Sequence, residues 1–346
     1  MQSIINQFQL ANPVRLPEAI KVGFINESYR LKAAQEGGVA YFLQRINHNI
    51  FQDVEGLQNN IERVTSHIRQ LLTEAGEADV ERKVLRVVPT LDGKLYYRTP
   101  EGEYWRMYVL IENALSYEQI TPESARLAGK AFGQFQCQLS TINCQLIETI
   151  PDFHNLEFRI KQLHEALEKD AAGRKAATQD IADFLLAHAE EMCLAERLYA
   201  EGKIQKRINH CDTKVNNILF DMEGNPMCIV DLDTVMPGFV FSDFGDFIRT
   251  AANTGAEDDP NLDNIGVNKA IYDAYLEGYL STATFLTELE ISLLPYGCQR
   301  MSFMQAVRFY IDYLNGDTYY KIMYPEHNLV RTQAQIRLFE EQRKSL

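Results

Sequence analysis

The residues best suited to chemistry lie in one stretch, His210–Asn217, and at an aspartate farther along the chain. Phosphoryl transfer asks little covalent chemistry of a protein: it needs a base for the acceptor hydroxyl, oxygen ligands for Mg²⁺ and positive charge near the moving phosphate. Asp212 can act as the base, and Lys214 can meet the phosphoryl group. Asn217 can offer an amide oxygen and Asp231 a carboxylate, and Mg²⁺ prefers such hard oxygen ligands.

A hairpin-like connection has to position the two metal ligands. Two short apolar runs, Asn217–Phe220 and Met227–Val230, flank the turn residues Asp221–Gly224, which favours a pair of antiparallel strands. Asp231 directly ends the second run, and Asp233 is a candidate second carboxylate ligand. The spacing therefore predicts a metal site at one end of the hairpin.

The pattern His210-x-Asp212-x-x-x-x-Asn217, followed by an apolar strand and Asp231, resembles the catalytic core of protein kinases and of the aminoglycoside/choline kinase-like small-molecule kinases. The resemblance implies that His210 orients the catalytic loop. A protein kinase is disfavoured, because the first lobe has no Gly-x-Gly-x-x-Gly, there is no Ala-Pro-Glu, and little chain follows Asp231 before the next expected helix.

Asp243-Phe-Gly245 spells the metal-binding tripeptide of protein kinases but lies too far beyond Asp212 for that task. We expect Asp243 and Asp246, which open a helix, to hydrogen-bond and brace the catalytic loop.

The elements around the site divide the chain near residue 112. Residues 1–112 are expected to form a β-rich N-lobe, with strands at 20–31, 40–46, 84–89, 95–97 and 104–112 and an amphipathic helix at 54–72. Residues 113–346 are expected to form a mainly helical C-lobe, with helices near 121–139, 156–167, 180–199, 243–252, 267–280, 286–315 and 330–343. The predicted fold class is α+β, a bilobal protein-kinase-like fold with the reaction between the lobes.

The composition excludes several classes of protein. The chain has 346 residues, a formal charge of -14 and a pI near 5.0, which argues against general binding of nucleic acid phosphates. No stretch is apolar enough for a membrane span or a signal peptide, and six scattered cysteines show no metal-ligand spacing. We expect a cytoplasmic monomer without nucleic acid or membrane partners.

Within the small-molecule kinases, the sequence motifs of this chain are similar to those of the N-acetylhexosamine 1-kinases. These enzymes phosphorylate the anomeric hydroxyl of N-acetylglucosamine or N-acetylgalactosamine with ATP. The resemblance is carried by Gly23–Tyr29, Tyr41–Asn47, Trp105-Arg106, His210–Asn217, Ile229–Gly238 and Asp243–Arg249. It implies ATP as co-substrate, Mg²⁺ as cofactor and an amino sugar as acceptor.

The same resemblance implies where the nucleotide binds. Gly23, Asn26 and Ser28 belong to the loop expected over the phosphates, and backbone groups around Glu112 are expected to read adenine. The usual strand lysine is missing. Gln44 or Arg45 stands in its place, and only one of the two can face the nucleotide because side chains alternate along a strand. Arg45 is preferred for bidentate phosphate binding, with Glu55 or Glu62 as its acidic partner.

Sugar recognition is expected from Arg308 and Asp312, which lie on one face of a helix, and from Tyr319 close behind. An ordinary surface ion pair explains the first two equally well. The main alternative function is a kinase of another small alcohol: an amino alcohol such as choline, another sugar or an aminoglycoside. For a cationic acceptor, Glu257–Asp259 is the candidate acidic pocket. A kinase fold that only binds is disfavoured, since base, lysine and metal ligands are all present.

Overall fold

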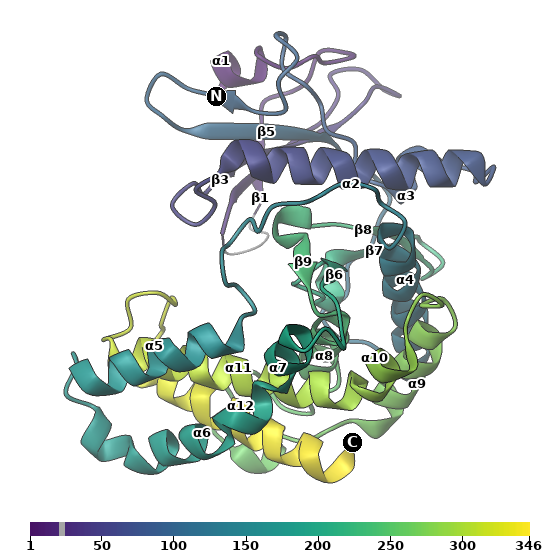
Figure 1. The fold of residues 1–346 in the computed structure, drawn as a ribbon. Helices are drawn as coiled ribbons and strands as arrows, with labels where there is room; N and C mark the ends of the chain where they lie inside the picture. Colours follow the sequence, from purple (N-terminus) through teal and green to yellow (C-terminus); the bar gives the residue numbers. More distant parts are fainter. Residues whose placement is uncertain (21–24) are drawn as a thin grey trace. The chain divides into compact units, whose positions relative to one another are not determined.

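The computed structural model describes residues 1–20 and 25–346 and divides them into two compact units (Figure 1). Unit 1 comprises Met1–Tyr117, Phe135–Pro151 and Asn216–Met236. Unit 2 comprises Glu118–Gln134, Asp152–Val215 and Pro237–Leu346. The expected boundary at 112 lies near the end of the first segment of unit 1, but this unit also takes in two later segments, one of which carries the hairpin with Asp231.

Unit 1 is built on an antiparallel sheet with the strand order β1-β2-β3-β5-β4. Its apolar core includes Leu43 of the central strand and Trp105 and Met107 of its neighbour, all buried. The sheet register sets Ser28, Gln44 and Arg106 side by side on three adjacent strands. The strands are β1 (Glu18–Ile20), β2 (Glu27–Leu31), β3 (Tyr41–Ile46), β4 (Tyr97–Arg98) and β5 (Tyr104–Val109).

The long helix α2 (Val54–Glu74) also belongs to unit 1 (Figure 1). Its N-terminus is capped by Asp53, whose carboxylate accepts the backbone N–H of Gly56 at 2.8 Å. The expected strand at 84–89 is wrong. The short helices α1 (Gln2–Ile5) and α3 (Val80–Lys83) are also present, and after α3 the chain meets β5 only through the isolated bridge between Val87 and Tyr108.

Unit 1 also contains the hairpin β7 (Ile218–Phe220) and β8 (Pro226–Ile229), followed by the 3-10 turn η3 (Leu232–Thr234). A second small pair, which belongs to unit 2 except for Met236, joins β6 (Arg207–Asn209) to β9 (Met236–Gly238). The turn η2 (Val215–Asn217) leads into β7. The expected hairpin is therefore present at its expected place.

Unit 2 is mainly helical, and its largest core cluster joins buried side chains from α5, α6, α11 and α12. Two expected long helices are broken, at Cys193 and at Leu293, and the second break precedes a proline that fits the first turn of the next helix. The helices are α4 (Pro122–Leu139, with its last residues in unit 1), α5 (Leu156–Lys169), α6 (Gln179–Met192), α7 (Leu194–Ala200), α8 (Val240–Ala251), α9 (Lys269–Leu280), α10 (Glu288–Ser292), α11 (Leu294–Leu314) and α12 (His327–Ser345), with the 3-10 turns η1 (Lys175–Thr178) and η4 (Leu262–Asn264).

Helices α8 and α11 approach each other at two glycines. A Cβ atom on Gly245 would lie 2.1 Å from the carbonyl oxygen of Gly297, and one on Gly297 would lie 2.1 Å from that of Phe241. Only glycine permits so close a backbone approach. The glycine of the Asp-Phe-Gly tripeptide is therefore required by helix packing.

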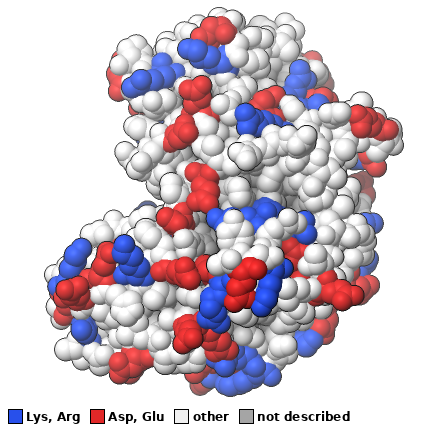
Figure 2. All heavy atoms as spheres, in the orientation of Figure 1, with Lys and Arg blue, Asp and Glu red and all other residues white. Residues whose placement is uncertain are grey.

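The fold class is confirmed: the structure is mixed α+β, with an antiparallel sheet in the first part of the chain and a larger helical part after it. Charged side chains of both signs are interspersed over the face shown in Figure 2. Within residues 1–20 and 25–346, no helix combines the length and apolarity that a bilayer crossing requires.

Candidate active site

In unit 2, the loop after β6 is fixed by carboxylates at the start of α8. Asp243 accepts the backbone N–H groups of His210 at 2.7 Å and Cys211 at 2.9 Å. Asp246 accepts the N–H of Thr213 at 3.2 Å. Cys211 has a left-handed backbone, with φ of 63°, so the loop holds a conformation that needs such support. This is the geometry expected of bracing residues.

The loop presents Asp212 and Lys214 as an ion pair, with a carboxylate oxygen of Asp212 2.9 Å from the Lys214 ammonium. Their side chains are 26% and 45% exposed, so both can reach a ligand. Burial lowers the pKa of Lys214, but the charges of Asp212 and Asp246 outweigh this effect and raise its pKa overall. Lys214 therefore stays cationic at neutral pH.

In unit 1, the hairpin register places the two expected metal ligands at the same end. Ile218 pairs with Ile229, and the N–H of Val230 donates to the carbonyl of Asn217 at 2.9 Å. Asp231 follows at once, with a left-handed backbone (φ 58°, ψ 56°) that begins η3. An amide oxygen and a carboxylate on facing strand ends are a donor set that fits Mg²⁺.

Asp233, the other expected ligand, forms a buried ion pair in unit 1. Its carboxylate accepts hydrogen bonds from both terminal nitrogens of Arg106, at 2.5 and 2.8 Å, and from the side-chain amide nitrogen of Asn26 at 2.7 Å. Arg106 also donates to the side-chain oxygen of Gln44 at 2.8 and 2.9 Å, and Gln44 donates to Ser28 at 3.0 Å. Of the expected nucleotide-binding residues, Asn26, Ser28 and Gln44 are thus joined in one network.

Arg106 is the functional candidate that our interpretation of the sequence left without a role. The signal was present: Tyr104–Val109 is an apolar strand interrupted by a single arginine. A buried arginine requires a carboxylate partner, but the sequence does not indicate which carboxylate that is.

The other expected nucleotide contacts are arranged differently. Arg45 forms ion pairs with Glu27 of β2 and with Glu103, which directly precedes β5, and not with the expected glutamates of α2. The backbone carbonyl of Glu112 accepts a hydrogen bond from the Arg82 guanidinium at 3.0 Å. Gly23 lies outside the described residues.

The expected pair Arg308 and Asp312 does not form. Asp312 is buried and accepts three backbone N–H groups of the following turn and the amide of Asn328, at 2.8 to 2.9 Å. The turn donors are Thr318, Tyr319 and Tyr320. Asp312 therefore closes the chain after α11, whereas Arg308 donates to Gln305 at 2.7 Å.

Arg308 lies instead among aromatic and basic groups of unit 2. Its guanidinium is 5.1 Å from the ring centroid of Phe153 and 5.7 Å from that of Tyr320. Burial, and after it the positive charge of the nearby Arg308, lowers the pKa of Arg159 to about 10. Among the described residues neither arginine has an ion-pair partner. Buried atoms without a hydrogen-bond partner gather here: Nε of Arg159, Nδ1 of His154 and the Tyr320 hydroxyl.

This cluster of Arg159, Arg308, Tyr320 and His154, which we call the arginine cluster, is linked electrostatically to the catalytic loop. The charge of Asp246 acts on both His154 and Lys214. Asp246 itself pairs with Arg249 at 2.9 Å. Asp246 is therefore near enough to both His154 of the arginine cluster and Lys214 for its charge to act on each.

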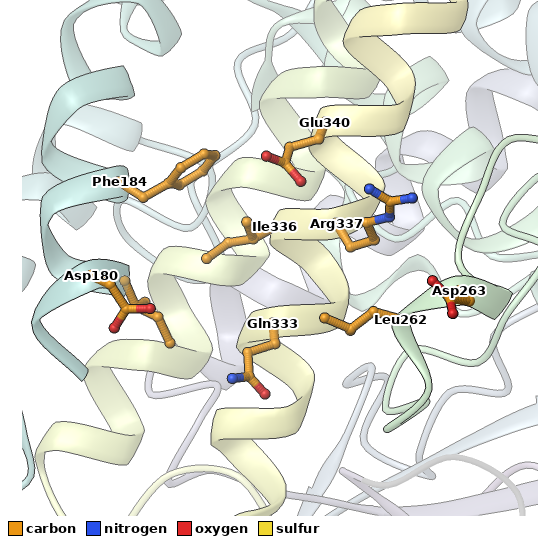
Figure 3. A pocket seen from close by; sticks show the side chains of 9 residues that line it. Asp180, Phe184, Leu262, Asp263, Gln333, Ile336, Arg337 and Glu340 are labelled. Atoms are coloured by element: carbon orange, nitrogen blue, oxygen red, sulfur yellow. The ribbon is translucent and has the colours of Figure 1, made fainter. Parts of the chain in front are cut away.

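Figure 3 shows a surface groove between α6, α12 and η4. Its lining includes Phe184 and Leu262 on the apolar side and Arg337 and Glu340 on the polar side. None of its lining residues belongs to the expected site.

The model of the phosphotransferase enzyme family abbreviated APH matches residues 18–285, which is most of the chain. The chain belongs to this family, so its class of reaction is phosphoryl transfer to a small molecule. This confirms the expected aminoglycoside/choline kinase-like family.

Solved structures of the same fold include several kinases. An amicoumacin kinase in complex with AMP-PNP, Ca²⁺ and its substrate matches with 12% identity and a TM-score of 0.63, over 98% of this chain and 92% of that one. A microcompartment-associated aminopropanol kinase matches with 15% identity and a TM-score of 0.60, over 99% and 95%. An ethanolamine kinase of Plasmodium vivax matches with 14% identity and a TM-score of 0.56, over 98% and 85%.

Proposed function

We propose that the protein transfers the γ-phosphoryl group of ATP to the anomeric hydroxyl of an N-acetylhexosamine, such as N-acetylglucosamine or N-acetylgalactosamine, to give the sugar 1-phosphate and ADP. The observation that carries the proposal is the Asp212–Lys214 pair, 2.9 Å apart on a loop whose backbone is held by Asp243 and Asp246. A base and a cation kept in fixed positions are what in-line phosphoryl transfer needs.

In this reaction Asp212 accepts the proton of the acceptor hydroxyl as its oxygen attacks the γ-phosphorus. The bond from phosphorus to the bridging oxygen of ADP breaks, and Lys214 compensates the charge of the phosphoryl group. Asn217 and Asp231 would hold Mg²⁺, which neutralises charge on the nucleotide phosphates when bound. The role of the protein is to position and to provide electrostatic stabilisation.

The arginine cluster supports an uncharged acceptor. Two neighbouring guanidinium groups without carboxylate partners attract hydrogen-bond acceptors and repel ammonium groups. The hydroxyl and acetamido oxygens of an N-acetylhexosamine are such acceptors. The exposed ring of Tyr319 and the ring of Tyr320, 4.8 Å apart, add an apolar surface suited to a sugar ring.

An amino alcohol is the second candidate, because two structures of the same fold are kinases of aminopropanol and ethanolamine. A cationic acceptor would need free carboxylates. The candidate acidic run is already engaged: Glu257 pairs with Arg249, Asp258 with His327, and Asp259 with the side chain of Asn264 at 3.0 Å. This observation favours the neutral sugar.

An acceptor screen tests the proposal. ADP release would be measured with MgATP and N-acetylglucosamine, N-acetylgalactosamine, glucosamine, galactose, ethanolamine and choline. We expect turnover with the N-acetylated sugars and little with glucosamine, which carries a cationic amine in place of the neutral acetamido group. Preferential turnover of the amines would reject the hexosamine assignment and leave the phosphotransferase class intact.

A further inference from the structure

The most completely satisfied charged pair of unit 1 lies next to the expected metal ligand. Arg106 and Asp233 have side chains that are only 2% and 5% exposed. They form a bidentate contact, and Gln44 accepts further N–H groups of the guanidinium. Removing such a pair from water is costly, so its presence at this position calls for a role.

The contacts argue against two simple roles. Arg106 has its terminal nitrogens directed at Asp233 and Gln44, which leaves little of the guanidinium to bind a phosphate. Both carboxylate oxygens of Asp233 accept hydrogen bonds, Oδ1 from Arg106 and Oδ2 from Arg106 and Asn26, so most of its acceptor capacity is already used within the pair.

The segment that the pair anchors holds Asp231 in a left-handed conformation, which is unfavourable for a residue other than glycine. Other contacts hold the same segment: the Thr149 hydroxyl donates to the carbonyl of Asp233 at 2.8 Å, and the Asn60 amide donates to that of Val235 at 3.1 Å. Asp231 therefore begins a turn that three sets of contacts within unit 1 hold in place.

We propose that Arg106 is a positioning residue which, through Asp233, fixes the Asp231 carboxylate in the orientation that binds Mg²⁺ with the nucleotide, and that Asp233 is not itself a metal ligand. The inference rests on the proposed use of MgATP. It does not depend on the acceptor. Loss of a residue that orients a metal ligand typically lowers metal affinity 10–100-fold.

The two assignments of Asp233 predict opposite effects of Arg106→Met. If Asp233 were a metal ligand, removing the arginine would release its carboxylate and add negative charge, so Mg²⁺ would bind as well as before or more tightly. If Arg106 positions the turn, the same change weakens Mg²⁺ binding roughly 10–100-fold. The double variant Arg106→Met, Asp233→Leu removes the pair without leaving a buried unpaired charge, so it retains the fold if the single variant does not.

The experiment is equilibrium binding of AMP-PNP to the full chain, titrated with Mg²⁺ and repeated in its absence, with thermal melting of each apo variant as the measure of folding. We expect the Mg²⁺ midpoint to rise at least 10-fold in both variants and nucleotide affinity without Mg²⁺ to change little. Arg98→Met, an exposed arginine on β4, is the matched control and should leave both unchanged.

An unchanged or lower Mg²⁺ midpoint in a folded Arg106→Met or double variant would overturn the inference. A wild type that binds no AMP-PNP with Mg²⁺ would reject the proposed function and this inference together. A wild type that binds AMP-PNP but phosphorylates no hexosamine would reject only the acceptor.

Discussion

At the scale of single residues, Asp212 has the environment of a positioned base. Its carboxylate is partly exposed, paired with Lys214 at 2.9 Å, and carried by a loop that hydrogen bonds hold on both sides. In the proposed reaction, Asp212 would accept the proton from a loop whose backbone is already held in place.

Asp212→Asn should leave the fold intact and lower turnover about 10²–10⁴-fold, because the amide cannot accept the proton. The measurement is kcat for ADP formation beside the thermal melting curve. Asp183→Asn, on the exposed side of α6, is the matched control and should retain wild-type turnover. Activity of Asp212→Asn within a few-fold of wild type would show that another group is the base.

How far single residues can be predicted depends on how local their signal is. Asp212 and Asn217 follow from spacing within one loop, and Asp243 from its place at the start of a helix. The roles of Arg106 and Asp312 could not be predicted in this way, since each depends on partners distant in the chain or on the course of a turn. Helical spacing predicted Asp312 beside Arg308, but the Asp312 carboxylate instead accepts hydrogen bonds from three backbone N–H groups of the following turn.

At the scale of elements, the approach of α8 to α11 positions the loop. Asp243 and Asp246 can brace the loop after β6 only if the start of α8 stays in place, and Gly245 permits the contact with Gly297. Most other elements were predictable because their periodicity is strong. The irregular segment at 84–89 was not: its apolar residues pack without pairing into a strand.

Gly245→Ala should destabilise the protein by about 1–3 kcal/mol, because the added methyl group meets backbone that cannot move easily. The sign of the change in the free energy of unfolding is informative. Alanine is a better helix former than glycine by up to about 1 kcal/mol, so helix propensity alone predicts a more stable variant. Urea unfolding measures the effect. A variant as stable as wild type would show that the two helices can separate at no cost.

At the scale of the whole molecule, burial of ionisable groups makes stability depend on pH. Burial is the main cause that lowers the pKa of His154 to about 3, and the charges of Arg308, Arg300 and Arg159 act in the same direction against Asp246. The unfolded chain binds a proton at this histidine near pH 6.5, whereas the folded chain does not. Stability should therefore be complete above pH 6.5 and fall as the pH decreases towards 3.

We predict that His154→Gln will flatten this dependence. The wild type should lose up to about 1.4 kcal/mol per pH unit from this group below pH 6.5, and the variant should lose correspondingly less. Urea unfolding at pH 7.5, 6.5 and 5.5 compares the two slopes, and the loss from other groups cancels in the comparison. Parallel slopes would show that His154 is protonated in the folded state.

The net charge of -14 acquires a meaning at this scale. A strongly acidic protein repels free ATP, but some of its acidic side chains, Asp231 among them, suit the magnesium complex that would bring ATP in. The composition argued against a protein that binds nucleic acid phosphates in general, while the loop His210–Asn217 indicated a site where ATP could serve as a phosphate donor.

The central claim, transfer of the γ-phosphoryl group of ATP to the anomeric hydroxyl of a hexosamine with Asp212 as the base, is tested most directly by ³¹P NMR of the product from MgATP and N-acetylglucosamine. We predict the signal of the sugar 1-phosphate with the wild type and almost none with Asp212→Asn. A 6-phosphate, release of inorganic phosphate alone, or equal product from the Asp212→Asn variant would contradict the account.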